Sequence, residues 1–172
     1  EQAKTVQSIA SEHGGLDFEW ATRQEERTRL WQARHDAYLA CMQLRPGNRG
    51  VATDVCVPVS RLAECIAATN EDIAKASMPV ALFGHVGDGN FHLVILVDAD
   101  NQNDLDEADA INQRLVMRAL AMGGTSTGEH GIGIGKLDFL DAEHGEAVAV
   151  MRAIKRALDP DNLFNPGKVV RL

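Results

Sequence analysis

One stretch decides the fold: Val80-Ala-Leu-Phe-Gly-His-Val-Gly-Asp-Gly-Asn-Phe-His-Leu-Val-Ile-Leu-Val97. It contains two apolar runs rich in branched residues, 80–86 and 91–97, joined by Gly87-Asp-Gly-Asn90. Runs of this kind favour β-strands, and the four polar or small residues between them are typical of a tight turn. The stretch therefore predicts a β-hairpin.

Helical patterns lie on both sides of this hairpin, as judged by apolar residues at three- and four-residue spacing. The helices expected cover residues 3–12, 22–43, 60–76, 104–122 and 142–158, and short extended segments are expected at 16–20 and 51–58. Helices interspersed with antiparallel strands predict an α+β fold: a small antiparallel β-sheet with helices on one face, ferredoxin-like, plus a C-terminal helical segment.

Two helix starts carry capping signals. Ser60 is expected to cap the helix that begins there, and Asp104, with Glu107 three residues later, forms the pattern of a capping box. The pair Gly123-Gly124 is expected to end the second of these helices.

Composition excludes several classes of protein. The 172 residues, 45% of them apolar, suggest one compact domain with a sizeable core. A net charge of −8 argues against a nucleic-acid partner. No apolar run reaches the roughly 18 residues of a membrane span, so no membrane span is expected. Three cysteines without a CxxC pair predict free thiols in a reducing compartment.

The hairpin carries two histidines. If Val86 faces Phe91 across the turn, His85 lies directly opposite His92 on the same face of the sheet. Two imidazoles so placed could bind zinc, manganese or iron, but they need a third ligand. Ordinary histidines at the end of a hairpin are the alternative.

A glycine-rich loop could supply that ligand. It reads Thr125-Ser-Thr-Gly-Glu-His-Gly-Ile-Gly-Ile-Gly-Lys136. Glu129 offers a carboxylate and His130 a general base, and two histidines with one carboxylate leave coordination positions open for a substrate. The glycine spacing matches neither a phosphate-binding loop nor a dinucleotide fingerprint. A flexible linker remains the alternative.

Arg34 is a candidate for substrate binding. It falls on the apolar side of its helix with Leu30, Trp31 and Tyr38. An arginine in that position either grips a carboxylate through two hydrogen bonds or forms an internal ion pair.

Five segments together resemble one family. The chain is similar to the C-terminal domain of FAD-linked oxidases of the vanillyl-alcohol-oxidase type, and within them to the cytochrome-linked D-lactate dehydrogenases, the glycolate oxidase flavin subunit and D-2-hydroxyglutarate dehydrogenase. The segments are Leu30-Trp-Gln-Ala-Arg-His35, Thr53-Asp-Val-Cys-Val-Pro58 with Ser60-Arg-Leu62, Gly84-His-Val-Gly-Asp-Gly-Asn-Phe-His92, Gly124 to Lys136, and Asp159-Pro160 through Asn165-Pro-Gly-Lys168.

The resemblance implies a role for each candidate residue. His85, His92 and Glu129 correspond to ligands of a divalent metal, His130 to the catalytic base and Arg34 to the arginine that holds the substrate carboxylate. Asn165, in the tail, would contact the flavin. Residues 1–172 would form the C-terminal substrate and metal domain, the cap of the enzyme. The family binds FAD mainly through a separate N-terminal domain, so the chain is expected to be a piece of a longer protein, inactive as a dehydrogenase by itself.

The implied activity is oxidation of a small 2-hydroxy acid. Ala52 and Val94 stand where the hydroxyglutarate enzymes carry a lysine and an asparagine, which favours a monocarboxylate such as D-lactate. The implied electron acceptor is a cytochrome, a quinone or an electron-transfer flavoprotein. A homodimer is expected, located in the cytoplasm or peripheral to the inner membrane, mitochondrial if the source is eukaryotic. A metal-dependent hydrolase and a non-catalytic domain are the rival functions.

Overall fold

The structure, a computed structural model, describes residues 1–172. Where the length suggested one compact domain, the chain divides into two compact units, residues 1–41 and 42–172. The first unit contains α1 (Gln2–Glu12) and most of α2 (Gln24–Met42), and neither helix has a buried residue. Both helices were predicted.

The strand expected at residues 16–20 is wrong. The segment is irregular, and Asp17 has a φ of 51°, in the left-handed region that breaks an extended backbone. No strand in the first unit pairs with it. Alternating apolar residues do not make a strand when no neighbour accepts its hydrogen bonds.

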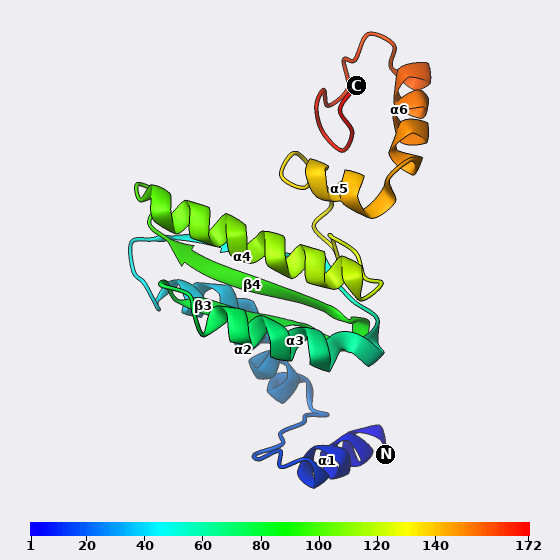
Figure 1. The fold of residues 1–172 in the computed structure, drawn as a ribbon. Coiled ribbons are helices and arrows are strands. Elements are labelled where there is room, and N and C mark those ends of the chain that lie inside the picture. Colours follow the sequence, from blue (N-terminus) through cyan, green and yellow to red (C-terminus); the bar gives the residue numbers. More distant parts are fainter. The chain divides into compact units, whose positions relative to one another are not determined.

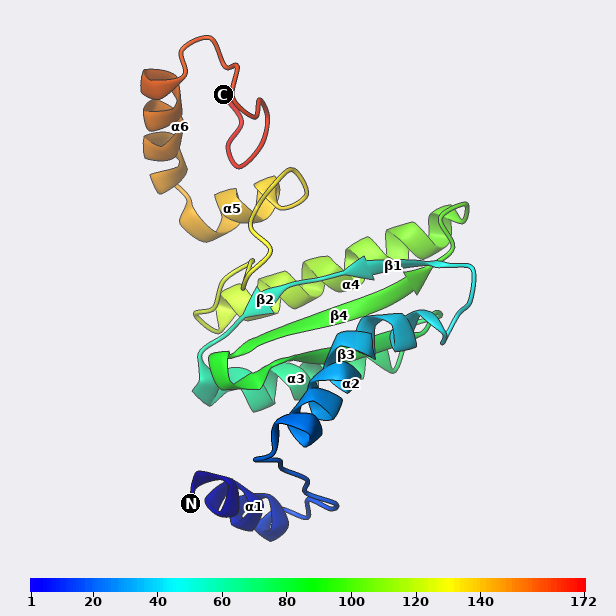
Figure 2. The same cartoon turned by 180° about the vertical axis from the view of Figure 1, so that it is seen from behind.

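The second unit is built on a four-stranded antiparallel sheet (Figures 1 and 2). Its central strand is β4 (Asn90–Val97), which pairs with β3 (Val80–His85) along one edge. Along the other edge it pairs first with β1 (Arg49–Ala52) and then with β2 (Val55–Cys56). These two short strands occupy the segment predicted to be extended, so the α+β fold is confirmed.

Two helices cover one face of this sheet: α3 (Val59–Ile73) and α4 (Gln102–Ala121), which run side by side in both views (Figures 1 and 2). The core between helices and sheet takes every second residue of β4, because successive strand residues point to opposite faces. Those core residues are Phe91, Leu93, Ile95 and Val97, packed with Leu62 and Cys65 of α3 and Ala108, Ile111 and Leu115 of α4. His92 therefore points to the face away from these helices.

The hairpin forms, but its register differs from the predicted one. His85 pairs with Asn90, and His92 pairs with Phe83. The reason is the connection, which occupies residues 86–89: η1 (Val86–Asp88) is a single 3₁₀ turn, and Gly89 follows with a φ of 76°. The difference is two residues, an even number, so both histidines stay on the same face as diagonal neighbours.

The capping predictions are wrong in detail. Helix α3 begins at Val59, with Pro58 before it and no side-chain cap, so Ser60 lies within its first turn. Helix α4 is capped by the Asn101 side chain, which accepts a hydrogen bond from the Asn103 backbone at 3.1 Å. Asp104 lies within the first turn of α4, where its carboxylate accepts from the Asn101 side chain and forms an ion pair with Arg45.

The expected final helix, 142–158, is two helices. Helix α5 (Leu137–His144) and helix α6 (Ala147–Leu158) are separated at Gly145, whose φ of 50° breaks the helical path. The expected ending of α4 at Gly123 is confirmed, with a φ of 75°. The cysteines are free thiols, as predicted. None of the helices combines the length and the apolar character needed to cross a bilayer.

Candidate functional site

Three donor atoms, two from the hairpin and one from the glycine-rich loop, meet on the sheet face opposite α3 and α4. Glu129 Oε1 lies 3.0 Å from His92 Nε2 and 3.4 Å from His85 Nε2. All three atoms lie within 4.8 Å of one another. His92 is buried, His85 is partly exposed and the Glu129 side chain is 51% exposed, so the group is open on the carboxylate side.

The ring of His92 is oriented by the strand beside it. Its Nδ1 atom lies 3.1 Å from the carbonyl oxygen of Thr53. A carbonyl can only accept, so Nδ1 carries a hydrogen, and this contact turns Nε2 toward Glu129. Thr53 is itself fixed to β4, because its hydroxyl accepts from the Leu93 N–H at 2.9 Å and its own N–H donates to the Leu93 carbonyl at 2.9 Å.

His130 lies at the edge of the same group. Its ring is stacked on the ring of His92, with 5.0 Å between centroids and 10° between planes. Its Nε2 atom is 3.9 Å from Glu129 Oε1, and its side chain is 47% exposed. The structure thus brings together four of the predicted residues, and it leaves the imidazole of His130 accessible to a small molecule.

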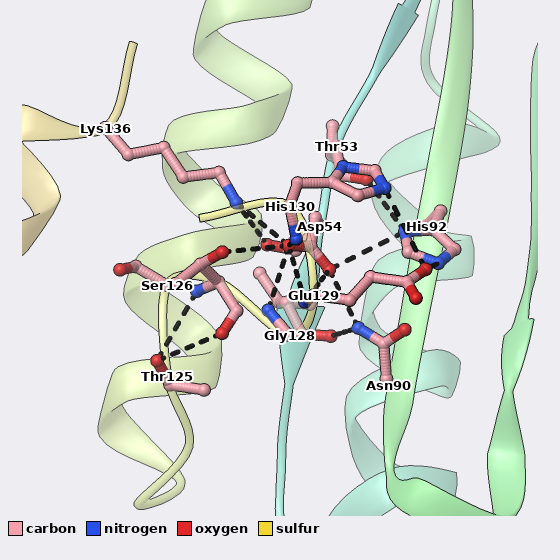
Figure 3. A network of polar contacts seen from close by, with 12 residues as sticks. Thr53, Asp54, Asn90, His92, Thr125, Ser126, Gly128, Glu129, His130 and Lys136 are labelled. Carbon is pink, nitrogen blue, oxygen red and sulfur yellow. Dashed lines mark hydrogen bonds and ion pairs between the residues drawn. The ribbon is translucent and has the colours of Figure 1, made fainter. Parts of the chain in front are cut away.

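Asp54 is the residue that the sequence reasoning missed. It lies between β1 and β2, its side chain is fully buried, and both carboxylate oxygens are occupied by donors (Figure 3). A signal was present: a single charged residue inside a mostly apolar extended segment. Its donors are Asn90 Nδ2 at 2.8 Å, Thr127 Oγ1 at 3.0 Å, the backbone N–H groups of Gly128, Glu129 and His130 at 2.9, 3.1 and 2.9 Å, and Lys136 Nζ at 3.2 Å.

These donors keep Asp54 ionised. Burial by itself would raise the pKa of this carboxyl, but the hydrogen bonds from the His130 backbone, Asn90 and the Glu129 backbone, with the charge of Lys136, outweigh it. The pKa is held far below its usual value. Because its lone pairs are already used, Asp54 is a poor metal ligand, although its carboxylate also lies close to His92 and His130.

The loop is fixed at a second point by helix α5. Glu143 accepts hydrogen bonds from the Ser126 N–H at 2.9 Å and from the Ser126 hydroxyl at 2.8 Å. Burial would raise the pKa of Glu143, yet these two bonds and one from Thr125 lower it. With so many contacts, residues 125–130 do not form the flexible linker that the sequence left open.

A cavity of about 320 Å³ borders two of the three donor residues, His85 and Glu129. It is lined by Cys56, His85, Asp88, Asn90, Gly128 and Glu129. Within it the Asn90 amide is fixed by Asp54, while its Oδ1 atom is buried without a hydrogen-bond partner. Two imidazole nitrogens and a carboxylate oxygen, two of the three at the edge of this cavity, fit a divalent transition-metal ion with positions left for a small ligand.

Comparison with known proteins assigns the chain to a family. A family model described as "FAD linked oxidases, C-terminal domain" matches residues 1–169. The chain belongs to this family. It is 49% identical to "Probable D-lactate dehydrogenase, mitochondrial" of Danio rerio, over 100% of the chain and 35% of that relative.

Other relatives of this FAD-linked oxidase domain carry two kinds of name. "D-lactate dehydrogenase [cytochrome], mitochondrial" of Arabidopsis thaliana is 43% identical over 99% of the chain and 30% of the relative. "Glycolate oxidase subunit GlcD" of Bacillus subtilis is 33% identical over 95% of the chain and 35% of the relative. The chain spans about a third of the length of these curated relatives.

Two further predicted residues come from other segments of this FAD-linked oxidase domain. Arg34 is on α2 in the first unit, and its guanidinium carbon is 5.3 Å from the centre of the Trp31 ring, a cation–π arrangement. Asn165 is in the tail after α6, in a turn with a φ of 48°. Their roles in substrate and flavin binding stay predictions.

Proposed function

We propose that the chain is the substrate- and metal-binding C-terminal domain of an FAD-dependent D-2-hydroxy-acid dehydrogenase, which oxidises D-lactate or a similar monocarboxylate to the 2-oxo acid. One observation carries this proposal. In an FAD-linked oxidase domain, His85, His92 and Glu129 converge on one point, with the free imidazole edge of His130 beside it.

The residues that would hold a metal are His85, His92 and Glu129. Zinc, manganese and iron all accept such ligands. When bound, the metal would supply Lewis acidity at the substrate hydroxyl and FAD would supply the hydride acceptor. The hydrogen bond from His92 Nδ1 to the Thr53 carbonyl supports this role, because it orients the ring so that Nε2 points toward the other two ligand atoms.

The chain's own residues would perform the remaining steps. His130 would take the hydroxyl proton at Nε2, which is the atom nearest to Glu129. Arg34 would hold the substrate carboxylate by its two-pronged guanidinium. Ala52 and Val94 are paired across β1 and β4, so neither supplies a cation or an amide for a second carboxylate. That pairing supports a monocarboxylate substrate.

The names of the relatives bear on the electron acceptor and on the location of the protein. Three of those with "D-lactate dehydrogenase" in their names are also named cytochrome and mitochondrial. We therefore favour a cytochrome as the electron acceptor, ahead of a quinone or an electron-transfer flavoprotein, and a mitochondrial location if the source is eukaryotic. The homodimer stays a prediction.

Flavin reduction tests the activity. The full-length protein, loaded with FAD and mixed without oxygen with D-lactate, L-lactate, glycolate or D-2-hydroxyglutarate, is expected to lose its visible flavin absorbance fastest with D-lactate. The advantage over D-2-hydroxyglutarate should be about tenfold or more, because a second carboxylate finds no partner. Flavin that no 2-hydroxy acid reduces, in a protein that hydrolyses esters or phosphoesters without flavin, would support the hydrolase instead.

Metal content tests the site. We expect about one zinc, manganese or iron ion per chain in the purified full-length protein, and almost none in the double variant His85→Ala, His92→Ala. The control is His13→Ala, His35→Ala, which removes two exposed histidines of the first unit. Elemental mass spectrometry makes the measurement. Equal metal in the two double variants would show that the ion is held elsewhere.

A further inference from the structure

Asp54 connects the two halves of the candidate site, and this role goes beyond the ligands themselves. One half is the hairpin, which carries His85 and His92. The other is the loop that carries Glu129 and His130. Residues 53 and 54 lie between them: the Thr53 carbonyl accepts from the His92 ring, and the Asp54 carboxylate accepts from Asn90 of the hairpin and from the loop backbone (Figure 3).

The contact with the loop is made to the backbone. Three consecutive N–H groups, those of Gly128, Glu129 and His130, point at the Asp54 carboxylate at 2.9, 3.1 and 2.9 Å. Successive N–H groups arranged in this way form a nest that binds an anion, here one supplied by the chain itself. Bonds to the backbone leave the side chains of Glu129 and His130 free while they fix the atoms from which those side chains start.

The carboxylate also closes the loop at its far end. Lys136 Nζ lies 3.2 Å from Asp54 Oδ2 and 3.0 Å from the Asp54 carbonyl oxygen, and the Lys136 side chain is largely buried. Thr127 and Lys136 therefore contact the same residue, so the intervening glycines span a closed loop. A buried carboxylate with one cation and several N–H donors is strongly held, because each donor would otherwise be left without a partner.

The close packing at Gly128 supports the same conclusion. A Cβ atom at this position would lie 1.8 Å from Asn90 Nδ2 and 2.8 Å from Asp54 Oδ1. The loop backbone thus approaches the Asp54–Asn90 pair as closely as a residue without a side chain allows. Since Asn90 belongs to β4 and pairs with His85, the loop is seated on the hairpin itself.

From these contacts we propose that Asp54 is a positioning residue, whose carboxylate sets the places of Glu129 and His130 relative to His85 and His92. The proposal rests on the proposed metal site for its consequence, but its geometric part concerns the loop alone. Replacement by asparagine keeps the volume and turns one acceptor into an NH₂ donor that faces N–H groups. The loop should then lose hydrogen bonds to residue 54 and move away from the hairpin.

The experiment compares Asp54→Asn with Asp104→Asn in the full-length protein. Asp104, like Asp54, is a buried carboxylate with one cationic partner, here Arg45. It accepts a hydrogen bond from the Asp98 backbone N–H at 2.9 Å. It takes no part in the loop, so it controls for the loss of a buried ionised carboxylate. Two quantities are measured: the Zn²⁺ dissociation constant by competition with a chelator, and hydrogen exchange of the 125–136 segment by mass spectrometry.

We expect Asp54→Asn to weaken Zn²⁺ binding about 10- to 100-fold, the usual effect of removing a residue that orients metal ligands. Exchange at residues 128–130 should accelerate in the same variant. Asp104→Asn should leave both quantities at the wild-type value, even if it lowers the thermal unfolding midpoint as much as Asp54→Asn does.

Two results would overturn the proposal. One is hydrogen exchange at residues 128–130 that is as slow in Asp54→Asn as in the wild type. The other is an equal loss of Zn²⁺ affinity in Asp54→Asn and Asp104→Asn. If the wild-type protein binds no Zn²⁺, the metal site fails, and hydrogen exchange alone then decides. Faster exchange in Asp54→Asn than in Asp104→Asn would still establish the positioning of the loop. Similar exchange in the two variants would refute it.

Discussion

Turnover of D-lactate by the full-length protein is expected to fall about 10²- to 10⁴-fold when His130 is replaced by glutamine, the range that loss of a general base usually gives. Glutamine keeps the length and a polar end but cannot take a proton near neutral pH. The backbone N–H of residue 130, which donates to Asp54 at 2.9 Å, is retained in this variant. The loop should therefore keep its place, and the loss should fall on the chemical step.

Metal content distinguishes a base from a ligand at this position. His130 also belongs to a second group of possible ligands, with Asp54 and His92. If His130 is the base, His130→Gln keeps its metal while turnover falls. Metal lost together with turnover would make His130 a ligand, and turnover that persists would remove it from the mechanism. His13→Gln, at an exposed histidine after α1, is the matched control and should change neither quantity.

The fold could be predicted to the level of its elements, because the apolar spacing of the hairpin and of α3 and α4 reflects one buried core. The predictions that failed concerned where helices begin and end, and which residues pair with each other. Asp104 has the chemistry of a helix cap, but it lies within the first turn of α4, and its carboxylate is paired with Arg45, 59 residues away in sequence. Segment 16–20 alternates like a strand and has no partner. Contacts distant in sequence decide both cases, and local pattern carries no information about them.

The candidate site shows the same division. His85, His92, Glu129 and His130 could be named because a metal needs these side chains and the motifs place them at turns. The exact register of the hairpin could not be predicted, since it depends on whether Asn90 belongs to the turn or to β4. Asp54 was missed for another reason: half of its donors are backbone N–H groups of a loop more than 70 residues away in sequence.

Gly89 is expected to be the most sensitive position of the hairpin. Its φ of 76° is unfavourable for a residue with a side chain, and a Cβ atom there would lie 2.0 Å from the Val57 carbonyl oxygen. Gly89→Ala should lower the opening free energy of the sheet by about 2–5 kcal/mol, from the left-handed backbone and from the forced displacement of Val57. Native-state hydrogen exchange of the β3 and β4 amides in the full-length protein measures that quantity.

Gly87→Ala is the matched control, two residues earlier in the same turn. A Cβ atom at Gly87 meets no other atom within 4 Å, so the exchange of β3 and β4 should stay close to wild type. Equal destabilisation by both variants would mean that the turn is sensitive to any side chain, and that the contact of Gly89 with Val57 is not the cause. A neutral Gly89→Ala would show that residues 86–89 connect the strands differently, and the diagonal placement of His85 and His92 would then fall with it, because the register of both histidines is set at this turn.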